Sequence, residues 1–234
     1  MAPTDPVILI TGATGGLGRV ATKAFAADGA RLALAGTDEG RLREVAADAG
    51  LQDDRWSPVV ADLRDQDSTR QALEDLGTRL GAIDVVLHLV GGYAAGAPVV
   101  DTDPADLRTM LDQHLWTTFN VTRSTVPGMV ERGWGRVMAI STPTASDPSP
   151  KSAPYAVGKA AGEILLRTLA KETANTGVTV NLVVVKSIDL KGERLTDPKK
   201  SSWTSPDEIV STLRFLASDE AAPITGARIP LYGR

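Results

Sequence analysis

The chain has 234 residues, 42% of them hydrophobic, with a formal net charge of −4 and a pI near 5.3. This length and composition can bury one substantial core, so we expect a single domain over residues 1–234. The acidic balance argues against a nucleic-acid partner, and the absence of cysteine excludes a disulfide framework and thiolate catalysis.

The start of the chain has no basic leader region, and no run of about 18 apolar residues occurs anywhere in it. We therefore expect a soluble cytoplasmic protein without a membrane partner. No cluster of residues with metal-ligand spacing is apparent, so no metal site is predicted.

The first predicted unit joins an apolar run at 7–10, a glycine-rich turn TGATGGLG at 11–18 and a helical stretch at 19–28. A strand, a glycine turn and a helix in this order can cradle a phosphate, because glycines let the backbone approach and the helix presents free amides. The alternative is an ordinary tight turn between strand and helix. The predicted dinucleotide-binding residues of this turn are Gly12, Thr14, Gly15, Gly16, Leu17 and Gly18.

Apolar runs and amphipathic stretches alternate along the rest of the chain, without an internal repeat or a linker. Strands separated by helices must pair in parallel through right-handed crossovers. We therefore predict an α/β fold with a Rossmann-type, doubly wound, seven-stranded parallel sheet, helices on both faces and ligands at the carboxyl ends of the strands. After the first unit, strands are predicted at 31–35, 56–60, 85–90, 136–140, 179–184 and 227–231, and helices at 39–49, 67–80, 106–119, 155–174 and 206–218.

Tyr155 and Lys159 stand four residues apart, so a helix places both on one face. A fixed positive charge beside a phenol favours the phenolate, so Lys159 should lower the pKa of Tyr155 and make the pair an acid/base device. An exposed pair without a function would have the same spacing. Thr142 lies 13 residues before Tyr155, where the strand at 136–140 ends in hydroxyl residues, with Ser141 expected to point to the other face.

With these motifs, the chain from Val7 to Gly233 resembles the short-chain dehydrogenase/reductase family. The resemblance implies that Thr142, in the place of a serine, bonds a substrate carbonyl, with Tyr155 as acid/base and Lys159 also holding the nicotinamide ribose. It further implies coenzyme contacts from Asp62 to the adenine, although an Asp capping the next turn is an equal alternative. The other implied coenzyme residues are Leu63, Gly91 and, through its backbone, Ile188.

The coenzyme preference should depend on the end of the second strand, where an acidic residue would bond the ribose 2′-hydroxyl. Gly36 takes that place and is followed by Thr37, with Arg41 nearby. These residues favour NADP(H) slightly over NAD(H). Asp38 argues weakly for NAD(H), and Gly15 stands where some NADP-dependent members have a basic residue.

The chain departs from the family pattern at several points. His114 takes the place of an asparagine that holds a water, so it either joins a proton relay with a pH-dependent charge or merely packs a helix. His88 is expected to be structural. A Pro-Gly pair near Val185 and a threonine near Leu190 are missing, and the segment 189–203 is short. We therefore expect an open pocket, or one capped by a neighbouring subunit.

These residues predict an oxidoreductase that moves a hydride between nicotinamide and a carbonyl or alcohol group of a small molecule. One alternative is a quinonoid dihydropteridine reductase, because the fragments 89–94, 115–117 and 201–204 look similar to that branch. The other is a weakly catalytic NAD(P)-binding regulator, suggested by the departures above. The helices at 106–119 and 155–174 are where family members pair, which implies a homodimer or homotetramer.

Overall fold

The computed structural model describes residues 3–233, so Met1, Ala2 and Arg234 at the ends of the predicted domain lie outside it. Its sheet has seven strands in the order β3-β2-β1-β4-β5-β6-β7, and every pair of neighbours is parallel. The predicted doubly wound fold is thus confirmed. The strands are β1 (Val7–Thr11), β2 (Arg31–Gly36), β3 (Trp56–Val60), β4 (Val85–His88), β5 (Gly135–Ser141), β6 (Val178–Val185) and β7 (Arg228–Leu231).

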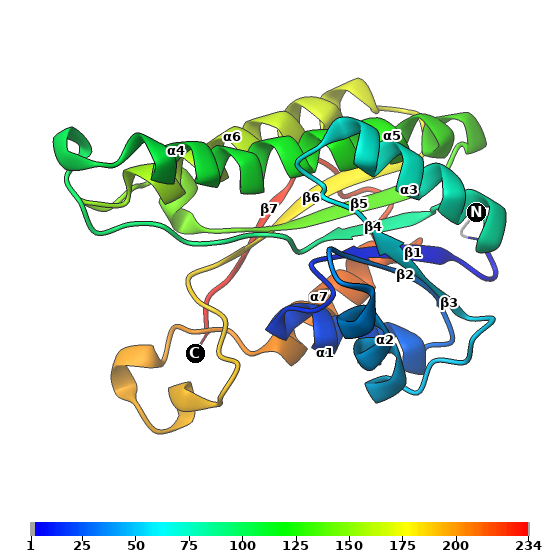
Figure 1. Cartoon of the computed structure of the whole chain (residues 1–234). Coiled ribbons are helices and arrows are strands. Elements are labelled where there is room, and N and C mark those ends of the chain that lie inside the picture. The colour runs from blue at the N-terminus through cyan, green and yellow to red at the C-terminus, as the bar shows by residue number, and fades with distance from the viewer. Residues whose placement is uncertain (1–2, 234) are drawn as a thin grey trace.

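Helices cover both faces of this sheet (Figure 1). One layer holds α3, α4, α5 and α6, and the other holds α1, α2 and α7. None of the helices within residues 3–233 is both long and apolar enough to cross a membrane. The helices are α1 (Gly16–Ala27), α2 (Glu39–Asp48), α3 (Gln66–Arg79), α4 (Pro104–Leu111), α5 (Thr117–Arg132), α6 (Ala153–Glu172) and α7 (Pro206–Ala217), with short turns η1 (Val99–Asp101), η2 (Asp112–Trp116), η3 (Pro143–Ala145), η4 (Glu193–Leu195) and η5 (Pro198–Lys200).

Side-chain caps mark where several helices begin. The carboxylates of Asp38, Asp65 and Asp103 accept backbone N–H groups in the first turns of α2, α3 and α4. Ser205 and Glu208 form a reciprocal capping box at the start of α7. These caps satisfy amides that a helix cannot bond internally, so they fix the points at which the chain leaves the strand ends.

Several predicted boundaries differ from those of the structure; the helix predicted at 19–28, for example, is α1 and begins at Gly16. The strand predicted at 85–90 ends at His88, after which the Leu89 N–H donates to the side chain of Thr11 on β1 instead of to a backbone carbonyl. The helix predicted at 106–119 is the continuous series α4, η2 and α5, which reaches Arg132 with Pro127 inside it. The turn η2 is a single π-helical turn between the two α-helices.

The order of the strands reverses between β1 and β4, where crossovers leave the sheet toward opposite faces. Both strands are buried along their whole length, so the sheet itself carries the core. Side chains above and below it form two hydrophobic clusters, one against each helix layer. The site therefore lies on a rigid support, at the carboxyl ends of these central strands.

Candidate active site

A cleft of about 700 Å³ opens at the carboxyl ends of β4, β5 and β6. Such crevices at the reversal point are where open α/β sheets bind ligands. The lining mixes apolar side chains with hydroxyl groups and two lysines. Its residues are Leu17, Leu89, Val90, Gly91, Gly92, Tyr93, His114, Ile140, Ser141, Thr142, Thr144, Tyr155, Lys159, Val185, Lys186, Ser187 and Ile188.

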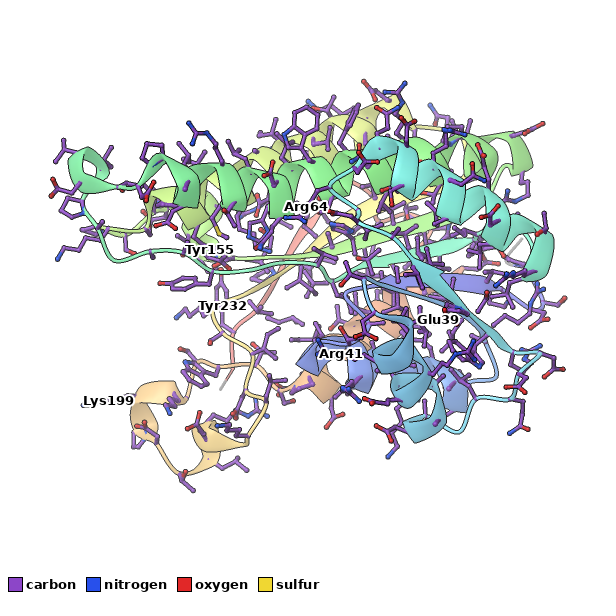
Figure 2. The ribbon with its side chains drawn as sticks, viewed as in Figure 1. Glu39, Arg41, Arg64, Tyr155, Lys199 and Tyr232 are labelled. Atoms are coloured by element: carbon purple, nitrogen blue, oxygen red, sulfur yellow. The ribbon has the colours of Figure 1, made fainter. Side chains whose placement is uncertain are left out.

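Tyr155 lies near the start of α6 and is labelled in Figure 2. It lines this cleft together with Thr142. Burial raises the pKa of Tyr155 above its ordinary value, and the neighbouring hydroxyl of Thr142 opposes this only in part. The ring of Tyr93 meets that of Tyr155 edge to face, with the centroids 5.0 Å apart. Tyr155 is therefore a protonated phenol at neutral pH.

The expected effect of Lys159 on Tyr155 is wrong in this structure. Lys159 Nζ donates to the carbonyl of Ile140 at 2.9 Å and lies 6.0 Å from the centroid of the Tyr155 ring. Burial lowers the pKa of Lys159 to about 8, although the charge of Glu163 acts to raise it. The pKa of Tyr155 is set by burial and by Thr142 and Tyr93, not by the ammonium. Both members of the pair are shifted by burial toward their neutral forms.

Two glycines let α6 pack tightly against the preceding helices, a feature that the sequence analysis missed. A Cβ on Gly158 would lie 2.6 Å from the carbonyl oxygen of Met110, and one on Gly162 would lie 2.6 Å from that of His114. Real Cβ atoms essentially never come closer than 3.0 Å to another heavy atom in this way. The Gly-x-x-x-Gly spacing within α6 was a signal that could have predicted this close packing.

His114 stands in the middle of the π-helical turn η2 and lines the cleft. Its Nε2 is 3.1 Å from the carbonyl oxygen of Gly92, and its ring meets that of Tyr155 with the centroids 5.7 Å apart. Burial, and then the charge of Lys159, lower its pKa to about 3. The expected pH-dependent charge is therefore wrong, because His114 stays neutral at physiological pH. The neutral ring donates its Nε2–H to the carbonyl of Gly92 and packs against Gly91 in the loop after β4.

His88 ends β4 beneath the cleft, and its structural role is confirmed. Its Nδ1 is 3.0 Å from Thr11 Oγ1, and its Nε2 is 3.3 Å from Thr117 Oγ1. Burial is the main cause that lowers the pKa of His88 to about 3. The neutral ring thus ties β1 to β4 and to the start of α5, without a free nitrogen for catalysis.

Glu163, one helical turn beyond Lys159, forms a buried polar group behind the cleft. Its carboxylate accepts the Ser141 hydroxyl and pairs with Arg228, whose Nε lies 2.8 Å from Oε2. Ser141 thus reaches Glu163 on α6, and it also lines the cleft together with Thr142. A cavity of about 20 Å³, enough for one water, lies among side chains that include Lys159 and Glu163.

The glycine turn has the geometry that a phosphate needs. A Cβ on Gly18 would lie 2.3 Å from the carbonyl oxygen of Gly12, and Gly12 has a φ of +66°. Gly15 stands at the N-cap of α1, and no side chain in the described chain caps that helix. Its first amides are therefore available to an anion. The exposed side chain of Leu190 lies over Gly16, because a Cβ there would come 2.5 Å from Leu190 Cδ1.

The residues expected near the adenosine half of the coenzyme follow the carboxyl ends of β2 and β3. Thr37 is exposed, and Arg41 projects from α2 (Figure 2). Asp38 accepts the backbone N–H of Arg41 at 3.1 Å, so its carboxylate serves as a helix cap. Asp62 binds the guanidinium of Arg64 and accepts its backbone N–H, while Leu63 is buried. Asp62 thus caps the turn that follows β3, which is the alternative to a contact with the adenine.

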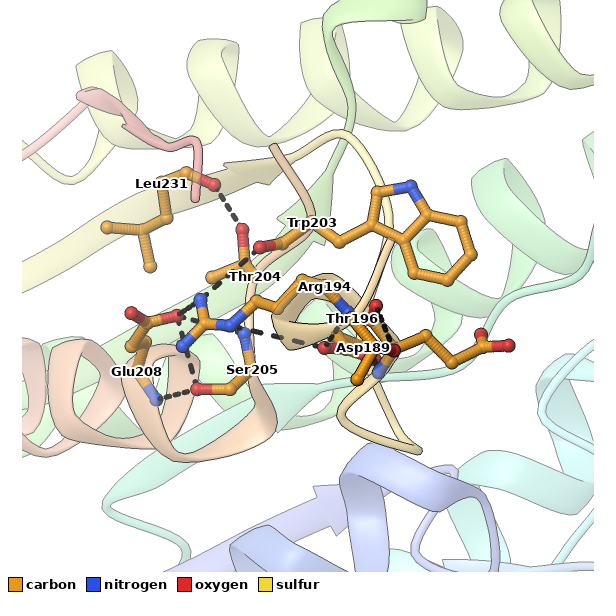
Figure 3. Close-up of polar contacts among 9 residues, drawn as sticks. Asp189, Arg194, Thr196, Trp203, Thr204, Ser205, Glu208 and Leu231 are labelled. Atoms are coloured by element: carbon orange, nitrogen blue, oxygen red, sulfur yellow. Dashed lines mark hydrogen bonds and ion pairs between the residues drawn. The ribbon is translucent and has the colours of Figure 1, made fainter. Parts of the chain in front are cut away.

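Hydrogen bonds hold the segment after β6, residues 189–203, in place (Figure 3). Asp189 accepts the backbone N–H groups of Glu193 and Arg194, which closes the turn η4. Arg194 then donates to the carbonyl of Trp203 and to Glu208 on α7. Ile188 lines the cleft just before this segment, and its carbonyl accepts the N–H of Leu190 at 3.1 Å.

Comparison with known proteins shows the family to which the chain is related. The family model described as short chain dehydrogenase matches residues 6–196. A subunit of (2S)-((R)-hydroxy(phenyl)methyl)succinyl-CoA dehydrogenase from Thauera aromatica is 30% identical, over 97% of this chain and 93% of the relative. The 3-oxoacyl-(acyl-carrier-protein) reductase of Thermotoga maritima is 28% identical, over 97% of this chain and 96% of the relative.

The crystal structure of NAD⁺-bound xylitol dehydrogenase has the same fold, with a TM-score of 0.87 over 98% of both chains and 22% identity. These relatives are similar to the chain over nearly its whole length. They do not support the likeness to dihydropteridine reductases and favour neither of the two alternative functions over a dehydrogenase or reductase.

Proposed function

The chain belongs to the short-chain dehydrogenase/reductase family of oxidoreductases, and we propose that it transfers a hydride between a nicotinamide coenzyme and the carbonyl or alcohol group of a small molecule, with Tyr155 as acid/base group. The observation that carries this proposal is that Tyr155 and Thr142 line one cleft, together with Leu17 of the glycine turn. Hydride transfer to a carbonyl needs a proton at the oxygen, and a buried phenol can supply it.

In the proposed mechanism, a substrate carbonyl oxygen lies between the hydroxyl groups of Thr142 and Tyr155. Thr142 orients the oxygen, and Tyr155 donates its proton as negative charge develops there. Lys159 is held in place by the carbonyl of Ile140 and adds positive charge to this region. When bound, the coenzyme supplies or accepts the hydride.

The residues present fit such a coenzyme. Gly18 packs against the backbone of Gly12 and Ala13 with no room for a Cβ, the helix α1 has no side-chain cap from the described residues, and Leu17 and Ile188 line the adjoining cleft. We propose that Gly12, Thr14, Gly15, Gly16 and Gly18 hold the pyrophosphate, with Asp62, Leu63, Gly91 and the backbone of Ile188 at the adenine and nicotinamide. Tyr155 and Lys159 would bond the ribose beside the nicotinamide.

NADP(H) is proposed over NAD(H). A 2′-phosphate would meet the exposed Thr37 and Arg41, and Arg41 has no ion pair within residues 3–233, whereas the carboxylate of Asp38 is turned to the helix amides. Fluorescence titration should therefore give tighter binding of NADPH than of NADH. Arg41→Gln should weaken NADPH about tenfold. Arg43→Gln is the matched control, because Arg43 pairs with Glu39 on the same helix. Tighter NADH binding to the wild type would overturn the preference.

Replacement of Tyr155 tests the proposed chemistry. Tyr155→Phe should lower kcat by about 10²–10⁴ and change the Kd of the coenzyme far less, because the variant loses the proton donor but only one hydrogen bond to the ribose. Tyr93→Phe removes a neighbouring hydroxyl from the same cleft and should cost less than about tenfold. The readout is oxidation of the coenzyme with a panel of ketones, aldehydes and 3-oxoacyl thioesters. Equal turnover in both variants would refute the role of Tyr155.

A homodimer or homotetramer and a cytoplasmic location are also proposed. Trp116 of η2 and Val157 and Ile164 of α6 are large apolar side chains that remain exposed on the helices expected to pair. Light scattering should give a multiple of the 24.6 kDa chain mass. Ile164→Asp should shift the protein to a smaller species, and a wild-type monomer would contradict the assembly.

A further inference from the structure

One lysine in the cleft has no part in the proposed chemistry. Lys186 follows directly on β6, is exposed and lines the same cleft as Tyr155 and Thr142. It stands where the family resemblance leads one to expect a Pro-Gly pair. The lining of the cleft therefore carries a long cationic side chain at a place where uncharged residues are expected. A charge at this position needs a chemical reason.

The cleft offers Lys186 no counter-charge. None of the described residues that line it is an aspartate or glutamate. Within residues 3–233, Lys186 makes no ion pair, and its Nζ lies 5.2 Å above the centroid of the Tyr232 ring. That ring holds the ammonium by a cation–π contact without neutralising it. Figure 2 shows Tyr232 and Tyr155 at the same open end of the sheet.

The other cations of this region are already engaged. Lys159 Nζ bonds the carbonyl of Ile140 inside the cleft. On the segment after β6, Arg194 binds Glu208, and Lys200 lies 2.9 Å from Glu193. Of the two lysines that line the cleft, Lys186 is therefore the one whose ammonium makes no hydrogen bond or ion pair with the described residues and is exposed to a ligand.

We propose that Lys186 binds an anionic group carried by the substrate, so that the enzyme acts on carbonyl compounds bearing a carboxylate, phosphate or sulfonate. The reacting carbonyl lies at Tyr155 and Thr142, and the anionic group reaches the ammonium at the end of β6. Thr144 and Ser187, which also line the cleft, supply further hydroxyl donors between these two points. This inference rests on the proposed function and deepens it by naming the substrate class.

The test compares charged substrates with their uncharged counterparts. Oxo acids with one to four carbons between carbonyl and carboxylate are assayed beside their methyl esters. Each assay is run at low salt and at about 0.5 M salt, where the Debye length is below about 5 Å and charges are strongly screened. We expect the wild type to prefer the acids. In Lys186→Gln the ratio of kcat/KM for acid over ester should fall about fivefold, and in Lys186→Glu about twentyfold.

Lys199→Gln is the matched control, because Lys199 is an exposed lysine on η5 that does not line the cleft (Figure 2). Its acid-to-ester ratio should equal that of the wild type. An unchanged ratio in both Lys186 variants would overturn the inference. A raised Kd for the coenzyme with an unchanged ratio would also overturn it, because Lys186 would then bind the coenzyme phosphates.

Failure of the proposed function gives a different result, in which the wild type turns over neither the acids nor the esters. The inference is then tested by binding alone. A 3-hydroxybutyrate titration of the coenzyme-loaded protein should show saturation that Lys186→Gln weakens about fivefold and Lys199→Gln does not. Equal binding to all three proteins would refute a role for Lys186.

Discussion

The close contact between α6 and the helices before it should control both stability and catalysis. In Gly158→Ala the new Cβ would lie 2.6 Å from the Met110 carbonyl oxygen, against the 3.4 Å at which ordinary contact begins. The helices must therefore separate by 3.4 − 2.6 = 0.8 Å at this point. Overpacking of this kind costs about 1–3 kcal/mol, of which the better helix propensity of alanine recovers about 0.5–1 kcal/mol.

We therefore expect Gly158→Ala to lower the free energy of unfolding by about 1–2 kcal/mol and Tm by about 2–8 °C. Because Gly158 lies between Tyr155 and Lys159, kcat/KM should also fall, by up to about 10²-fold for a displacement near 1 Å. Thermal unfolding and steady-state kinetics measure the two effects. The control is Gly77→Ala on α3, where no heavy atom lies within 4 Å of the new Cβ.

Gly77→Ala should stabilise the protein by about 0.5–1 kcal/mol and leave kcat/KM unchanged, because it improves helix propensity without a new contact. The reasoning fails if Gly158→Ala matches the wild type in both measurements, or if Gly77→Ala loses as much stability as Gly158→Ala.

Three further predictions concern charge and access. Glu163→Gln removes the carboxylate that raises the pKa of Lys159. We expect kcat to fall as pH rises through about 8, where Lys159 loses its charge, and this fall should move to lower pH in the variant. An unmoved pH profile of kcat in a folded variant would contradict this. His88 is neutral when folded, with a pKa of about 3, and protonates near pH 6.5 when unfolded. Its contribution to stability is thus complete above pH 6.5 and is lost as pH falls toward 3, by about 2 kcal/mol at pH 5. Urea unfolding at pH 8 and pH 5 should show a smaller difference in His88→Gln, and an equal difference would argue against it. Leu190→Ala uncovers Gly16 and should speed coenzyme association in stopped-flow fluorescence, whereas an unchanged rate would show that Leu190 does not obstruct the turn.

Patterns with a short physical cause were predictable from the sequence. Continuous apolar runs fit strands that are buried on both faces, and the turn at Gly12–Gly18 fits a close approach that only glycine permits. The four-residue spacing of Tyr155 and Lys159 was sufficient to place both in one cleft. These features depend on neighbours in the chain, which is why they could be read without a structure.

The course of α5 depended on tertiary contacts and could not be read in this way. Residues beyond Phe119 include several threonines and Pro127, which have low helix propensity. In the structure, Thr122 and Thr125 bond carbonyls one turn earlier and are buried against neighbouring elements. Packing of this face therefore outweighs the local preference. The π-helical turn is likewise fixed by His114, which reaches Gly92 on a loop 22 residues away.

The protonation of Tyr155 depends on burial in the same way. Spacing alone shows an ammonium one turn from a phenol and suggests a lowered phenol pKa, but the fold partly buries both residues and turns the ammonium to the carbonyl of Ile140. Desolvation then raises the pKa of Tyr155 and lowers that of Lys159. A phenol that keeps its proton is ready to donate it, whereas oxidation of an alcohol would require its phenolate. We therefore infer that the site favours carbonyl reduction at neutral pH and that alcohol oxidation needs a more alkaline solution.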